Sequence, residues 1–132
     1  MKIAVYARSA TGPSVQILEV PAIRKQLSEI EDWAQQNEHE IVETFAEVGG
    51  GFSNRGSELD KMLSNAASNE HPYDAIVVRD YARISRQTLR LLEIIKFLET
   101  GHQVRIVSLE NEANPFLAER LQRVMRAFKI YK

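Results

Sequence analysis

The stretch AIVVRDYARISR, residues 75–86, consists of four consecutive apolar residues followed at once by arginine and small polar side chains. An apolar run of this length predicts a strand buried on both faces, which is typical of a parallel sheet. The opening stretch KIAVYARSAT, residues 2–11, repeats this form, with an apolar run that ends at Arg8. Two further apolar runs, EIVETFA at 40–46 and VRIVSL at 104–109, give four predicted strands in all.

Residues with helical spacing separate these runs. Pro21 suits a first helical position, and Ile23, Leu27 and Ile30 continue an apolar stripe toward a stop at Asn37. Ser57 followed by Asp60 resembles an acidic variant of a capping box at the start of the next helix. The predicted helices are 21–37, 59–66, 89–98 and 115–132.

Strands that alternate with helices predict a three-layer α/β/α fold. The connections form βαβ units, so the sheet is expected to be mostly parallel, with four or five strands and helices on both faces. With 132 residues and 44% apolar content, one domain with a sizeable core is expected. The strands expected in one sheet are Lys2–Ala7, Ile41–Ala46, Ala75–Val78 and Val104–Val107.

Composition excludes several classes of function. There is no cysteine, so a disulfide, a thiolate nucleophile and a cysteine metal site are all excluded. The three histidines have no metal-ligand spacing and are interpreted as surface residues. The net charge is −1, so any nucleic-acid contact must come from local patches. No apolar run reaches membrane-spanning length and no signal peptide opens the chain, so a cytoplasmic location is expected.

Two groups of arginines follow two different predicted strands. Arg8 ends the first, and Arg83 and Arg86 follow the third. In open α/β sheets the carboxyl edge is where ligands bind, and guanidinium groups match phosphate oxygens. We therefore expect the three arginines to converge on a phosphate-sized site beside Ala10. The alternative is a set of solvated arginines paired with carboxylates such as Asp80, which is the commoner outcome for charge runs.

The last predicted helix is both amphipathic and basic. Its apolar residues follow the spacing of a coiled-coil seam, and its polar residues are mostly positive. One interpretation is a surface helix that packs on its own sheet. The other is a helix that leaves the domain, pairs with a second chain and presents its basic side to DNA. The apolar seam is Leu117, Leu121, Val124, Phe128 and Tyr131, and the basic residues are Arg120, Arg123, Arg126, Lys129 and Lys132.

The order of these motifs resembles the catalytic domain of the serine recombinases, which include resolvases, invertases and large serine integrases. Residues 6–10, Tyr-Ala-Arg-Ser-Ala, resemble the opening Tyr-x-Arg-x-Ser motif of that family, and 82–86 resemble its Asp-Arg-x-x-Arg signature. Glu47, the loop from Gly49 to Ser53, and Arg55 resemble the intervening acidic and Gly/Ser-rich segment. The helix from about 115 to 132 resembles the start of the family's long dimerisation helix.

The resemblance implies a resolvase-like fold and a definite chemistry. A serine hydroxyl would attack a DNA phosphodiester, giving a 5′-phosphoserine link and a free 3′-hydroxyl, without metal or other cofactor. Homodimers would assemble into a synaptic tetramer, rotate one pair of subunits and religate the strands. Implied catalytic arginines are Arg8, Arg83 and Arg86; implied supporting residues are Glu47, Ser53, Arg55 and Asp80. Implied dimer and DNA contacts on the last helix are Leu117, Arg120, Leu121, Arg123, Val124, Arg126 and Phe128.

The chain also departs from the family pattern. Ala10 stands at the nucleophile position, and Ser9 precedes it. Because strand side chains alternate, residue 10 is expected beside Arg8 and Ser9 away from it. The preferred explanation is an engineered serine-to-alanine replacement; a natural inactive relative and a shifted nucleophile at Ser9 are the alternatives.

Other departures bear on the site and on domain organisation. Ala82 replaces the usual aspartate of the second motif, and Arg55 lies one residue further from the next leucine than in the family pattern. A separate DNA-binding domain, as the family has, is not expected within these 132 residues. A different class of function also stays open, namely a non-enzymatic α/β module that binds an anion or a protein partner.

Overall fold

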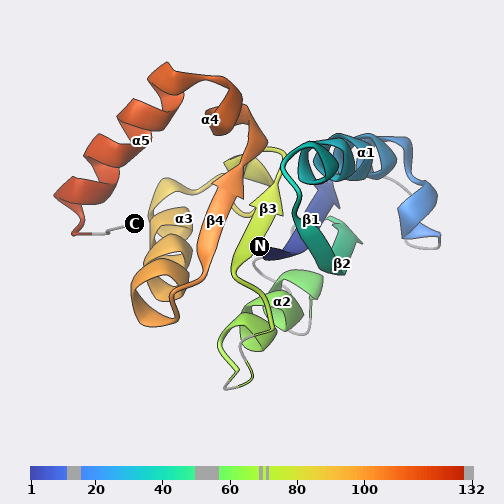
Figure 1. The fold of residues 1–132 in the computed structure, drawn as a ribbon, viewed down its shortest axis with the longest axis horizontal. Helices are drawn as coiled ribbons and strands as arrows, with labels where there is room; N and C mark the ends of the chain where they lie inside the picture. The colour runs from blue at the N-terminus through green and yellow to red at the C-terminus, as the bar shows by residue number, and fades with distance from the viewer. Residues whose placement is uncertain (12–15, 50–56, 69, 71, 130–132) are drawn as a thin grey trace.

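Four parallel strands form one sheet in the computed structural model, which describes residues 1–11, 16–49, 57–68, 70 and 72–129. The order across the sheet is β2-β1-β3-β4, and each neighbouring pair is parallel (Figure 1). This confirms the predicted single sheet and all four strands. Their bounds are β1 (Lys2–Ser9), β2 (Glu40–Val48), β3 (Ala75–Val78) and β4 (Arg105–Ser108).

Helices cover both faces of the sheet, as predicted. Alternate residues of β1 point to opposite faces: Ile3 and Val5 join the core beneath α1, whereas Ala4 and Tyr6 join the core beneath α2 and α3. The helices are α1 (Pro21–Gln36), α2 (Glu58–Ala66), α3 (Thr88–Lys96), α4 (Leu109–Ala113) and α5 (Pro115–Ala127). Shorter turns are η1 (Ile17–Glu19), η3 (Tyr81–Arg83) and the π-helical η4 (Phe97–Gly101).

Helix ends follow the local chemistry of the sequence. Pro21 opens α1, and the Ser57 hydroxyl accepts a hydrogen bond from the amide of Asp60 at 3.2 Å, which is the N-cap half of the predicted capping box. Ser108 caps α4 in the same way, because its hydroxyl accepts from the amide of Asn111. None of the helices in the described part of the chain is both long enough and apolar enough to cross a membrane.

The C-terminal region differs from the prediction in three ways. Leu109, predicted as the end of a strand, begins α4, because Ser108 caps a helix there. The last helix ends at Ala127, and Lys129 has a left-handed φ of 58°. The residue of α5 that inserts into the domain core is Met125, which was not in the predicted seam.

Helix α5 packs against its own domain, beside α3 (Figure 1). Leu121 contacts the same core as Met125, and Leu117 is half-buried. Val124 and Phe128 remain 39% and 49% exposed. The seam is therefore divided between contact with the domain and solvent, and its fifth member, Tyr131, lies outside the described residues.

Candidate functional site

The candidate site lies where the sheet changes its direction of growth. From β1 the chain moves to one side to form β2 and to the other side to form β3, so the switch point lies between β1 and β3. β1 is eight residues long and pairs with β2 from Lys2 to Ser9, but it pairs with β3 only from Ile3 to Val5. The carboxyl end of β1 therefore has an open side toward β3.

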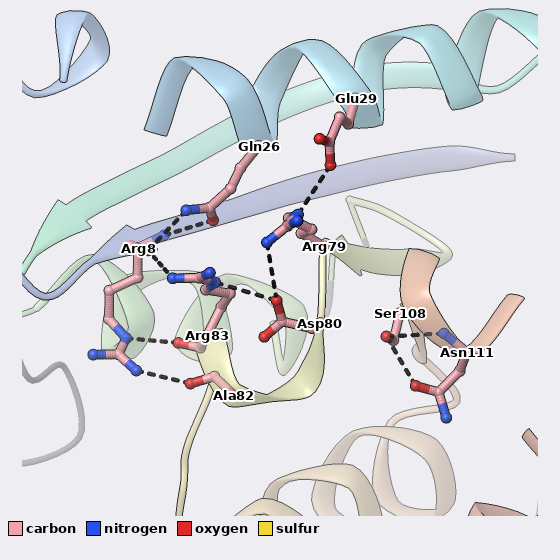
Figure 2. A network of polar contacts seen from close by, with 9 residues as sticks. All are labelled: Arg8, Gln26, Glu29, Arg79, Asp80, Ala82, Arg83, Ser108 and Asn111. Carbon is pink, nitrogen blue, oxygen red and sulfur yellow. Dashed lines mark hydrogen bonds and ion pairs between the residues drawn. The ribbon is translucent and has the colours of Figure 1, made fainter. Parts of the chain in front are cut away.

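Arg8 donates hydrogen bonds to three backbone carbonyls at this edge. Its Nε donates to the carbonyl of Arg83 at 2.8 Å, its Nη2 to that of Ala82 at 2.8 Å and its Nη1 to that of Gly49 at 3.0 Å. Figure 2 shows the guanidinium turned toward the first two of these carbonyls. One side chain thus joins the end of β1 to the segments that follow β2 and β3.

Arg83 in turn donates a hydrogen bond to the backbone of Arg8. Its Nη1 donates to the carbonyl of Arg8 at 3.1 Å, and its Nε lies 3.4 Å from Oδ2 of Asp80 (Figure 2). A guanidinium has five N–H donors, so both arginines keep N–H groups that these bonds do not use. The crossed pair can therefore donate to an anion without losing its internal bonds.

Gln26 on α1 was missed by the sequence analysis. This side chain is only 2% exposed; its Oε1 accepts from the amide of Arg8 at 3.2 Å and its Nε2 donates to the carbonyl of Arg8 at 2.9 Å. The Gln26 amide thus replaces the strand partner that the short β3 does not supply. An amide between Ile23 and Ile30 in an otherwise apolar stripe was the available signal.

The two residues around the nucleophile position differ in access. Ser9 ends β1 and is buried, and its hydroxyl donates to the carbonyl of Thr11 at 2.6 Å. Ala10 follows the strand and is exposed. Ala10 has no nucleophilic group, and the proton of the Ser9 hydroxyl is already held by Thr11.

Glu47 joins β1 to α2. Its Oε2 accepts from the hydroxyl of Tyr6 at 2.6 Å and from the amide of Leu59 at 3.0 Å. Burial raises the pKa of Tyr6 above its ordinary value, and the hydrogen bond and negative charge of Glu47 raise it further. The carboxylate satisfies a free N–H at the start of α2, which is favourable for an anion at a helix N-terminus.

The remaining predicted residues are placed differently. Arg86 is exposed, and it forms neither a hydrogen bond nor an ion pair with the described residues. Asp80 is within ion-pair distance of Arg79, at 3.8 Å, and of Arg83, at 3.4 Å. Ser53 and Arg55 lie outside the described residues. The structure thus brings Arg8, Arg83 and Asp80 together.

Pockets lie on the surface of the domain. A cleft of about 350 Å³ is lined by Glu29, Arg79, Asp80, Leu109, Glu110 and Ala113. A larger, mainly apolar cavity of about 540 Å³ lies between α2 and α3, where Leu63, Ile94 and Phe97 line it. Within the described ranges, no group of three or more His, Cys, Asp or Glu side chains is placed to hold a metal ion.

The sequence and the structure were compared with those of known proteins. The family model "Resolvase, N terminal domain" matches residues 3–130. No curated protein sequence matches the chain significantly. The N-terminal catalytic domain of TP901-1 integrase is similar in structure, with a TM-score of 0.69 at 18% identity over 98% of this chain and 96% of that one.

Two other solved structures are similar over most of their length. A resolvase family site-specific recombinase from Streptococcus pneumoniae has a TM-score of 0.66 at 18% identity, covering 98% of this chain and 93% of that one. The C-terminal catalytic domain of ISC1926 TnpA, an IS607-like serine recombinase, has a TM-score of 0.65 at 20% identity, covering 99% and 86%. At these identities the structures share a fold with this chain.

Proposed function

The chain belongs to the resolvase N-terminal domain family, that of serine recombinase catalytic domains, and from this membership we propose that its arginine pair holds a DNA phosphate during site-specific recombination. The observation that carries the proposal is the crossing of Arg8 and Arg83 at the carboxyl edge of the sheet, with Arg8 two residues before position 10. Two fixed guanidinium groups with unused N–H donors suit the charge that develops on a phosphoryl group in its transition state.

The chemistry requires a hydroxyl that this chain lacks at residue 10. With serine there, the hydroxyl oxygen would bond to phosphorus while the bond from phosphorus to the 3′ oxygen breaks. The serine proton leaves, and the 3′ oxygen gains a proton to become a free hydroxyl. Because Ala10 has no such oxygen, the present chain is proposed to bind the phosphate and not to cleave it.

Ser9 is not the preferred nucleophile. Ser9 is a buried residue and its hydroxyl donates to the carbonyl of Thr11, so an attack on phosphorus would first have to break that bond. Residue 10 is exposed and immediately follows the strand that carries Arg8. Access therefore favours residue 10.

Assembly through α5 is the second part of the proposal. Val124 and Phe128 are left exposed on this helix, as is Phe116 at 67%, and apolar residues left together in water favour burial by a partner. Arg120 and Arg126 are exposed on the same helix, so DNA would meet positive charge close to the interface. We propose a homodimer that forms a synaptic tetramer on double-stranded DNA.

Covalent trapping on nicked DNA tests the nucleophile. The Ala10→Ser chain, incubated at high concentration with a pool of nicked random-sequence duplexes, should form a denaturant-resistant adduct at the 5′-phosphate. The unchanged chain should form none, and Ala10→Ser combined with Ser9→Ala should form as much as Ala10→Ser alone. Mass spectrometry would identify the residue that carries the nucleotide.

The outcomes separate the hypotheses. Adduct on residue 10 that disappears with Arg83→Gln supports the proposed site. Adduct on Ser9 in the unchanged chain would assign the nucleophile to Ser9 instead. Binding of DNA or another anion with no adduct in any variant would leave the non-enzymatic module as the function.

A further inference from the structure

Asp80 lies between two arginines at the edge of the candidate site. Its Oδ2 is 3.4 Å from Nε of Arg83 and 3.8 Å from Nη1 of Arg79, and its side chain is only 16% exposed (Figure 2). A carboxylate sheltered to this degree is held in place by the cationic partners that face it. The position of the Asp80 carboxylate thus depends on Arg79 as well as on Arg83. Because Asp80 contacts Nε of Arg83, its position affects how Arg83 is oriented.

Arg79 is anchored on helix α1. Its Nε lies 3.0 Å from Oε2 of Glu29. Glu29 follows Gln26 by three residues, so both side chains lie on the same face of α1. Gln26 holds the backbone of Arg8. One face of α1 thus contacts both Arg8 and Arg79, and Figure 2 shows the side chains of Gln26 and Glu29 pointing away from that helix toward them.

The charge around Arg79 argues against a direct phosphate contact by this residue. The cleft of about 350 Å³ beside it is lined by the carboxylates of Glu29, Asp80 and Glu110, and Arg79 is the one cation among the described residues that line it. A phosphate entering this cleft would meet more negative than positive charge. Arg79 is therefore better suited to hold Asp80 than to hold an anion.

We propose that Glu29 and Arg79 are positioning residues that act through Asp80 to orient Arg83. The inference rests on the proposed role of Arg83 in holding DNA phosphate. It also accounts for Ala82, which leaves no carboxylate directly before Arg83. Asp80 supplies that carboxylate from two residues earlier, and Arg79 and Glu29 keep it in place. Without them, Asp80 would swing toward solvent and Arg83 would lose one of its two fixed contacts.

Solvent exchange of the Arg83 side chain directly tests this relay, in which Glu29 and Arg79 act through Asp80 on Arg83. In ¹⁵N NMR, the Nε–H exchange rate of Arg83 should rise about two- to fivefold in Arg79→Met and in Glu29→Gln, the range expected for a partly exposed ion pair. It should rise further in Asp80→Asn, and Arg79→Lys should restore part of the protection by restoring the charge. All of these side chains reach solvent, and thermal unfolding would verify that each variant is folded.

Arg90→Met is the matched control. Arg90 is 38% exposed against 40% for Arg79, and it too forms an ion pair, with Glu93 at 3.7 Å. Its loss should leave the Arg83 exchange rate unchanged. An Arg83 rate in Arg79→Met equal to that in Arg90→Met would overturn the relay.

Cleavage kinetics in the Ala10→Ser background provide the functional readout. Arg79→Met should lower kcat about tenfold and leave KM nearly unchanged, because a misplaced transition-state contact affects the chemical step more than binding. Faster Arg83 exchange with an unchanged kcat would refute the positioning role. If the Ala10→Ser parent itself forms no adduct, the proposed function fails, and the exchange rates alone then decide whether the relay orients Arg83.

Discussion

Replacing Gln26 with leucine should destabilise the protein by about 2 kcal/mol. Leucine keeps the approximate volume of the side chain and removes both of its hydrogen bonds to Arg8. Each such bond contributes about 0.5–1.5 kcal/mol, and a buried N–H left without a partner costs about 1–3 kcal/mol. The carbonyl of Arg8 keeps the bond from Arg83 Nη1, so the larger part of the loss comes from the Arg8 amide. Burial of the leucine methyl groups offsets part of the cost.

Urea denaturation measures this loss, and amide hydrogen exchange locates it. The midpoint should fall with no change in the slope, and the Arg8 amide should exchange about tenfold faster, which corresponds to about 1.4 kcal/mol. Gln35→Leu, an exposed position on the same helix, is the matched control and should change stability by less than about 0.5 kcal/mol. Equal stability of the two variants, or unchanged exchange at Arg8, would refute the view that Gln26 substitutes for a strand.

Two more predictions concern the buried tyrosine and the last helix. Because the pKa of Tyr6 is raised in the folded protein, unfolded chains lose the phenolic proton first. The contribution of Tyr6 to stability should therefore be complete below pH of about 10 and be lost above it, and Tyr6→Phe should reduce the fall in stability seen in urea titrations at pH 9 to 11. Met125→Ala should cost about 2–5 kcal/mol because the side chain is fully buried, whereas Val124→Ala should cost less than about 1 kcal/mol; equal losses would contradict the observed packing of α5.

The sheet was predictable because each strand carries its own signal. The apolar run at 75–78 and its counterparts are short, continuous and separated by helical spacing, and the observed strands differ from the predicted bounds by at most two residues at either end. The cap at Ser57 was predictable for the same reason, since its partner lies three residues away in sequence. Both depend on local chemistry.

The contacts of the site were less accessible to sequence reasoning. That Arg8 and Arg83 share one edge followed from the strand order, but the bonds from Arg8 to the carbonyls of Gly49 and Ala82 depend on where two loops pass. Met125 was not identified from the sequence for a related reason. The apolar residues of α5 are spread widely around the helix, and the packing of the domain places Met125 in the core together with Leu121, whereas Val124 and Phe128 stay partly exposed.

The brevity of β3 has a consequence for how this protein could change over time. β1 continues past the last residue that β3 pairs with, and the side chains of Gln26 and Arg83 make the hydrogen bonds that β3 does not supply. If β3 were two residues longer, it could supply them as ordinary ladder hydrogen bonds. The backbone of Arg8 would then need neither Gln26 nor Arg83, and Arg83 would lose one of its two fixed contacts. The length of β3, which contributes no side chain to the candidate site, thereby affects how firmly Arg83 is held.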